Sequence, residues 1–62
     1  MTIVTSDIGR AVSFSTDGVV TGYGTVYEVD GSAVSVTLTN NYKDSKIGWI
    51  LVLDSGDITA FI

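Results

Sequence analysis

The sequence predicts an all-β fold: one domain over residues 1–62, built of five short antiparallel strands joined as hairpins. Apolar side chains recur at every second position between Val19 and Leu38, whereas a helix would repeat them about every 3.6 residues. The same segments are rich in the β-branched and aromatic residues that strands favour. Short turns rich in glycine and aspartate separate them, which indicates a small barrel or two orthogonal sheets.

The first predicted strand covers residues 9–14 and has Val12 and Phe14 as its apolar pair. Turn-forming residues follow from Ser15 to Gly18, before the chain becomes apolar again. We therefore expect a turn at this point and a second strand that begins at Val19.

The second and third strands are predicted to form a hairpin around Asp30-Gly31, a pair that favours the positive φ angles of a tight turn. A two-residue loop would pair Tyr27 with Val34, and a four-residue loop would pair Val29 with Val34. Both keep the apolar side chains on one face, whereas a three-residue loop without a bulge would split them. The set expected to point inward is Val19, Thr21, Tyr23, Thr25, Tyr27, Val29, Val34, Val36 and Leu38.

The opposite face of this hairpin carries two glycines, Gly22 and Gly24, at positions two apart. Glycine weakens a strand but lets it bend sharply, so this pair is expected to curl the sheet toward a barrel. The face that carries the glycines is expected to meet solvent, and its members are Gly22, Gly24, Val26, Glu28, Ser35, Thr37 and Thr39.

The fourth predicted strand, residues 47–53, is apolar on both faces except at Gly48, which indicates a central strand or one between the core and a subunit partner. Trp49 is accordingly expected in the core or in an interface. Residues 54–57 form a turn in which the aspartates are expected to bond the backbone. A four-residue loop there would place the side chains of the last strand, 58–62, on one shared face: Ile58, Ala60 and Ile62 with Leu53, Leu51 and Trp49.

Three segments together resemble the SH3-like small barrels of the KOW and Tudor kind: residues 7–14, 22–31 and 35–38. The middle segment has the pattern G-x-V-x-x-V-D-G over residues 24–31, followed by a further strand and two closing strands. The resemblance covers most of the chain and implies a five-stranded SH3-like barrel. It concerns the fold, which does not determine the function.

The composition excludes several kinds of chemistry. The chain has 62 residues and contains neither histidine nor cysteine, which removes imidazole bases, thiol nucleophiles, disulfides and His/Cys metal sites. The chain has seven acidic and only three basic residues, so its net charge is −4. This charge argues against binding nucleic acid through its phosphates. We expect no enzyme, no catalytic residue, no metal and no cofactor.

A domain of this size buries only about 60% of the surface of its unfolded chain, and small folds usually add disulfides, metal or a second subunit. Because thiols and metal ligands are missing, we expect a homo-oligomer. The start of the chain lacks the basic and apolar regions of a signal peptide. The longest apolar stretch is much shorter than the roughly 20 residues that span a bilayer, so we expect a cytoplasmic protein without membrane contact.

The candidate binding residues lie in the longest polar segment, residues 40–46, and are Asn40, Asn41, Tyr42, Lys43 and Lys46. Tyr42 is expected to be exposed there, because no apolar pattern accounts for it, and exposed tyrosines are common anchors at interfaces. The two lysines are suited to a carboxylate or phosphate. The resemblance to Tudor domains implies an alternative, an aromatic cage for methylated cations, for which the rings are those of Tyr23, Tyr27, Tyr42 and Trp49.

The function expected from these features is that of a non-catalytic protein-binding module, which acts as a small homo-oligomer and docks through its loops and one exposed sheet edge. Small, acidic, cysteine-free domains of this kind resemble accessory and inhibitor proteins of bacteriophages. Two alternatives remain open. One is an oligomeric binder of an anionic small molecule around Tyr42, Lys43 and Lys46, and the other is an acidic mimic of nucleic acid.

Overall fold

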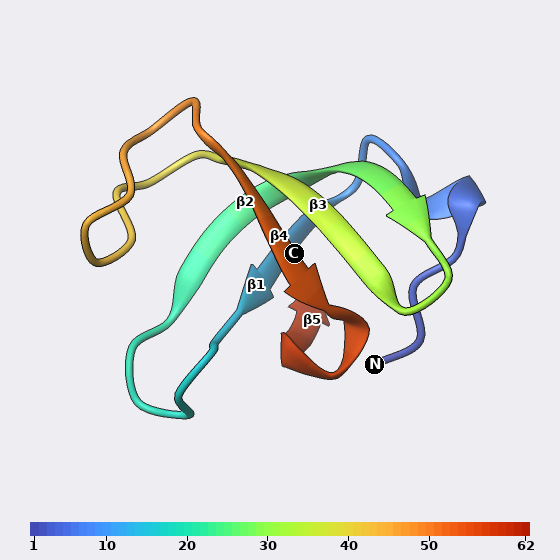
Figure 1. Cartoon of the computed structure of the whole chain (residues 1–62), viewed down its shortest axis with the longest axis horizontal. Coiled ribbons are helices and arrows are strands. Elements are labelled where there is room, and N and C mark those ends of the chain that lie inside the picture. The colour runs from blue at the N-terminus through green and yellow to red at the C-terminus, as the bar shows by residue number, and fades with distance from the viewer.

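The chain folds into five strands and two short 3-10 helices, and the computed structural model describes all 62 residues (Figure 1). The expected all-β fold class is confirmed. The elements, in chain order, are η1 (Thr5–Asp7), β1 (Ala11–Phe14), β2 (Gly22–Asp30), β3 (Ala33–Leu38), β4 (Ile50–Asp54), η2 (Ser55–Asp57) and β5 (Ile58–Phe61).

All strands belong to one antiparallel sheet in the order β4-β3-β2-β1-β5. Strand β5 pairs with β1 and not with β4, because η2 carries the chain from one edge of the sheet to the other. This order is compatible with an SH3-like fold. The sheet is not closed into a barrel, however, since β4 and β5 remain its two edges.

The core lies on the concave side of this twisted sheet, where β4 passes in front of β1 and β5 (Figure 1). The expected apolar pair of β1 is confirmed, because Val12 and Phe14 are fully buried. Val34, Val36 and Leu38 of β3 also point inward as expected. The ten buried apolar residues are Ile3, Val12, Phe14, Val26, Val34, Val36, Leu38, Tyr42, Leu53 and Ile58.

The expected inward face of β2 is wrong over most of the strand. Gly22, Gly24 and Val26 are buried, whereas Tyr23 and Tyr27 are exposed. The reason is a β-bulge: Val26 pairs with Val36 and Glu28 with Ser35, so Tyr27 is an extra residue without a partner. The predicted pair Val29–Val34 is present. Because the bulge adds one residue, the alternation that holds at Val29 predicts the wrong face for every residue of β2 that precedes the bulge.

Two glycines of β2 make room for close packing rather than face solvent: Gly22 for aromatic rings and Gly24 for the neighbouring strand β3. A Cβ atom at Gly22 would lie 2.7 Å from the Tyr42 ring and closer still to the Phe14 ring. A Cβ atom at Gly24 would lie 2.8 Å from the carbonyl oxygen of Thr37 on β3. Both distances are far below van der Waals contact, so these positions exclude a side chain on the concave side.

The β2–β3 hairpin turns at Gly31-Ser32, between the paired residues Asp30 and Ala33. Gly31 has a φ of 60°, but Ser32 does not have a positive φ, a combination typical of a type II′ turn. The hairpin is therefore confirmed, while the turn is centred one residue later than the Asp30-Gly31 pair suggests.

Two other boundaries differ from expectation. Strand β2 begins at Gly22, and Val19 lies in the β1–β2 loop with 84% of its surface exposed. Strand β4 begins at Ile50, because Gly48 adopts a φ of 89° and ends the preceding turn, so Trp49 is exposed rather than in the core. In β5 only Ile58 is fully buried in the core, and the register shift against β1 between Ser13 and Phe14 explains why the alternation fails.

A Gly22→Ala substitution is predicted to lower the free energy of unfolding by about 1–3 kcal/mol, because the new methyl group overpacks the Phe14 and Tyr42 rings. Urea denaturation of the purified chain measures the change. Phe14→Leu serves as the matched background. With this smaller side chain at position 14, Gly22→Ala is expected to lower the free energy of unfolding by clearly less. An equal cost in both backgrounds contradicts the packing role of Gly22.

Candidate functional site

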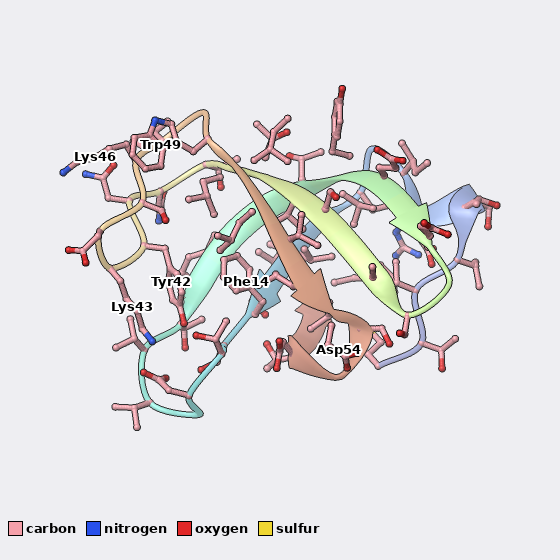
Figure 2. All side chains as sticks on the ribbon, viewed as in Figure 1. Phe14, Tyr42, Lys43, Lys46, Trp49 and Asp54 are labelled. Carbon is pink, nitrogen blue, oxygen red and sulfur yellow. The ribbon has the colours of Figure 1, made fainter.

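The β3–β4 connection, which carries all five candidate binding residues, lies against the β1–β2 loop (Figure 2). Tyr42, expected to be exposed, is only 3% exposed. Its ring packs edge-on against Phe14, with 4.8 Å between ring centroids and 64° between ring planes. Tyr42 is therefore a core residue supplied by a loop, and the expectation that it is an exposed anchor is wrong.

The Tyr42 hydroxyl fastens the two loops together. It accepts a hydrogen bond from the Thr16 N–H at 3.1 Å and donates one to the Val20 carbonyl at 3.3 Å. The Thr16 hydroxyl lies 2.9 Å away and completes the network. Burial alone raises the pKa of Tyr42, but the hydrogen bonds from Thr16 and the nearby Lys43 charge outweigh it, and the pKa lies below its ordinary value of 10.0.

Lys43 is also engaged within the molecule. Its ammonium group lies 2.9 Å from an Asp17 carboxylate oxygen and donates to the Thr16 hydroxyl at 3.2 Å. It also lies 5.4 Å from the centre of the Tyr42 ring. A left-handed backbone at Lys43, with φ of 54°, aims the side chain at this loop. The hydrogen bond to Asp17 raises the pKa of Lys43 above 10.5.

Asp17 organises the β1–β2 loop from inside. One carboxylate oxygen accepts the N–H groups of Val19 and Val20 at 2.8 and 3.0 Å, while the other faces Lys43. The bond from Lys43, followed by the two backbone N–H bonds, holds the pKa of Asp17 well below 3.8. The expected turn at Ser15–Gly18 is thus present and is stabilised by a side chain from within it.

A hollow of about 310 Å³ opens where these loops meet β4. Tyr42 and the turn after it form one wall, and the β4 side chains form the other. The only cation in it, Lys43, is already paired with Asp17, and Asp44 adds a negative charge. This charge distribution disfavours an anionic ligand. Its lining residues are Thr16, Tyr42, Lys43, Asp44, Ser45, Leu51, Val52 and Leu53.

The remaining candidates, Asn40, Asn41 and Lys46, are exposed. The Asn41 side-chain oxygen accepts the Ile47 N–H at 3.0 Å, which stabilises the turn before β4. Lys46 forms no ion pair and lies at the outer end of the connection, beside Trp49 (Figure 2). The polar segment thus has two parts. Tyr42 and Lys43 are held against the core and the β1–β2 loop, whereas Lys46 is exposed near the start of β4.

A second candidate surface includes three residues of β2, Tyr23, Thr25 and Tyr27, that the alternation predicts to point inward. We define the outer face as the convex side of strands β2 to β4. Four large side chains on it are exposed, Tyr23 and Tyr27 by 38% and 54%, and Ile50 and Val52 by 51% and 68%. Its members are Tyr23, Thr25, Tyr27, Glu28, Ser35, Thr37, Ile50 and Val52. The bulge at Tyr27 is the feature that hides this surface from sequence reasoning.

The aromatic rings do not gather in one cage. Tyr42 points to the concave side against Phe14, whereas Tyr23 and Tyr27 point to the opposite side of the sheet. The turn carboxylates behave as expected, since Asp54 accepts the Gly56 N–H at 2.8 Å. No three acidic side chains lie close enough together to hold a metal ion.

No protein-family model, curated protein or solved structure matches the chain. The structure contains no helix with the length and hydropathy needed to cross a membrane.

Substitutions at Tyr42 test its place in the core. Tyr42→Ala is predicted to lower the free energy of unfolding by about 3–5 kcal/mol, as for other buried aromatic side chains. Tyr42→Phe keeps the ring but leaves Thr16 N–H and Val20 C=O without their partner, and is expected to cost about 1–2 kcal/mol. Urea denaturation measures both. A loss under about 0.5 kcal/mol for Tyr42→Ala, the usual range for a surface residue, contradicts this placement.

The Asp17–Lys43 pair is predicted to make stability depend on pH. Because folding lowers the pKa of Asp17 below 3.8, the stabilisation is fully present above about pH 4 and is lost as the pH falls further. The difference in unfolding free energy between the native chain and Asp17→Asn should therefore shrink from pH 7 to pH 2. Lys43→Gln is the matched comparison and should remove the part of this pH dependence that the ion pair contributes, while the N–H groups of Val19 and Val20 retain the rest. A pH dependence unchanged by Lys43→Gln contradicts the pair.

Proposed function

We propose that the chain is a non-catalytic protein-binding module that docks a partner on the outer face of its sheet. The observation that carries this proposal is the exposure of four large side chains, Tyr23, Tyr27, Ile50 and Val52, on one face. The opposite face already buries its own apolar side chains, so the exposed ones contribute nothing to the core. An apolar patch of this kind on a small soluble domain is typical of an interaction site.

The composition of the outer face supports a protein partner. Two tyrosines and two aliphatic side chains supply apolar contact, and the hydroxyls of Thr25, Ser35 and Thr37 lie among them. Tyrosines combined with small hydroxyl residues are characteristic of protein-binding surfaces, because the rings give contact area at low entropic cost. Tyrosine is also enriched among the residues that contribute most to binding energy. Tyr27, held outward by the bulge, is the central anchor in this proposal.

Charge contributes less than apolar contact to the proposed docking. Two of the seven acidic residues, Asp7 and Asp17, are paired with Arg10 and Lys43 within the molecule. Glu28, which pairs with Ser35, is the only charged side chain among the defined members of the outer face. Binding through this face should accordingly change little with ionic strength, unlike that of an acidic mimic of nucleic acid.

Three finer expectations belong to the same proposal. An SH3-like fold is supported by the strand order and by η2 between the last two strands. A cytoplasmic location and a role among phage-type accessory proteins rest on the acidic, cysteine-free composition. A small homo-oligomeric form rests on the apolar surface that one chain leaves exposed.

Photo-cross-linking in cells that produce the chain tests the proposed docking surface. With benzoylphenylalanine at position 27, one discrete protein should be captured. The matched control is the same residue at position 19, since Val19 is more exposed than Tyr27 but lies in the β1–β2 loop. Capture of the same protein with equal yield from both positions contradicts docking on the outer face.

Binding measurements with the captured protein then give the energetic test. Tyr27→Ala is expected to weaken binding by at least about tenfold, as for an interface hot spot, and Val19→Ala by less than about twofold. Raising the salt concentration to about 0.5 M should leave the affinity within about threefold. A steep loss of affinity with salt instead favours the acidic mimic.

A further inference from the structure

The edge of the sheet formed by β4 is open and unprotected. Its residues from Ile50 to Leu53 contain no charge, no proline and no bulge, although such features usually guard an edge strand against pairing. The other edge, β5, has four residues, and the Arg10 guanidinium lies 3.6 Å above the ring of its Phe61. Strand β4 is therefore the edge that is free to accept another strand.

Two backbone hydrogen bonds indicate which groups of β4 point to the open side. The Leu38 N–H donates to the Trp49 carbonyl before the strand, and the Ser55 N–H donates to the Ser32 carbonyl after it. Residues of an antiparallel strand alternate between bonding one side and the other. Odd-numbered residues between these two points therefore bond β3, and the backbone groups of Ile50 and Val52 face away from the sheet.

We propose that a second copy of this chain pairs with this edge, β4 against β4, antiparallel about a two-fold axis. In the register that we propose, Leu51 lies opposite Leu51 of the second copy, and Ile50 opposite Val52. The backbone groups that face outward then bond each other, and the exposed side chains of Ile50 and Val52 meet on one continuous outer face. This inference specifies the oligomer of the proposed function, but it concerns the strand edge and not the anchor Tyr27.

Charge complementarity favours a second copy in antiparallel orientation. Lys46 precedes β4 and forms no ion pair, while Asp54 and Asp57 lie at its other end (Figure 2). Antiparallel pairing brings the cationic end of one copy to the acidic end of the other, twice per dimer. In the proposed register Asp54 lies opposite Gly48, two residues from Lys46. Parallel pairing would place like charges together.

The hollow beside β4 also favours a second copy, because it offers apolar surface that the second β4 strand would cover. It is lined by Leu51 and Leu53 of the edge strand on one side and by Tyr42 on the other. The inward-facing Leu51 of a second copy would lie over this hollow, against Leu51 of the first. Pairing thus buries apolar side chains on both faces of β4, and it also satisfies the backbone groups along its free edge.

Cysteine cross-linking tests the dimer and its register, since the native chain contains no cysteine. Residues opposite each other in a non-hydrogen-bonded antiparallel pair lie close enough for a disulfide. Leu51→Cys, which faces its own symmetry mate, is expected to form a disulfide-linked dimer under mild oxidation at least about tenfold faster than Val52→Cys, although Val52 is more exposed. Faster linking of Val52→Cys, or equal slow linking of both, overturns the proposal.

Light scattering on the native chain gives an independent readout: the mass should approach twice the 6.5 kDa of one chain and fall on dilution. Val52→Lys should raise the dimer dissociation constant at least about tenfold without changing the circular dichroism spectrum, because its side chain is 68% exposed. Thr25→Lys, on the same face but distant from the edge, is the matched control. A native chain that is monomeric throughout, or equal effects of both lysines, overturns the dimer.

The two proposals fail separately. Dimerisation is measured on the isolated chain and depends on β4, whereas partner capture is measured from position 27 on β2. A monomeric native chain that still cross-links one protein from position 27 refutes the dimer alone. A dimer that captures nothing from that position refutes the docking surface alone.

Discussion

The absence of a side chain at Gly22 is the constraint on which the rest of the structure depends. The space above this glycine holds the rings of Phe14 and Tyr42, one from β1 and one from the β3–β4 connection. With its ring seated there, Tyr42 places its hydroxyl against the β1–β2 loop, and Lys43 then reaches Asp17. A loop composed of polar residues thus becomes part of the core, and the loop that faces it acquires a fixed conformation. Any side chain at Gly22 would displace both rings and, through them, both loops.

The bulge at Tyr27 has an equally specific effect on the surface. One unpaired residue reverses the alternation of β2, so Val26 and Val29 both point inward while Tyr27 and Glu28 point outward. The outer face gains an exposed tyrosine, and the core keeps an unbroken row of small and branched side chains. Because bulges also twist a strand, the same residue contributes to the curvature that separates the convex side from the concave one. Local backbone irregularity therefore determines which aromatic rings are available to a partner.

The sequence was sufficient to predict the fold class, the five strands, the central hairpin and the buried faces of β1 and β3, because these follow from local periodicity and turn chemistry. The inward face of β2 was predicted wrongly, since a bulge changes the alternation without leaving a signal in composition. Tyr42 was misplaced for a different reason: nothing near it in the sequence is apolar, and its partner Phe14 is distant along the chain. The missing side chain at Gly22 was the one available signal that a ring from elsewhere in the chain fills this side of the sheet. Pairing of β5 with β1 depends on the path of η2, which periodicity does not encode.

The order of the strands has a consequence for biosynthesis. The two margins of the sheet, β4 and β5, are consecutive in the chain and leave the ribosome after the other three strands. Until they emerge, β1 and β3 each lack a neighbour: Phe14 lacks its partner Ile58 on β5, and Val34 lacks its partner Leu53 on β4. A nascent segment ending before residue 50 therefore has no complete hydrophobic layer, and the sheet is expected to fold only after β4 and β5 have both emerged.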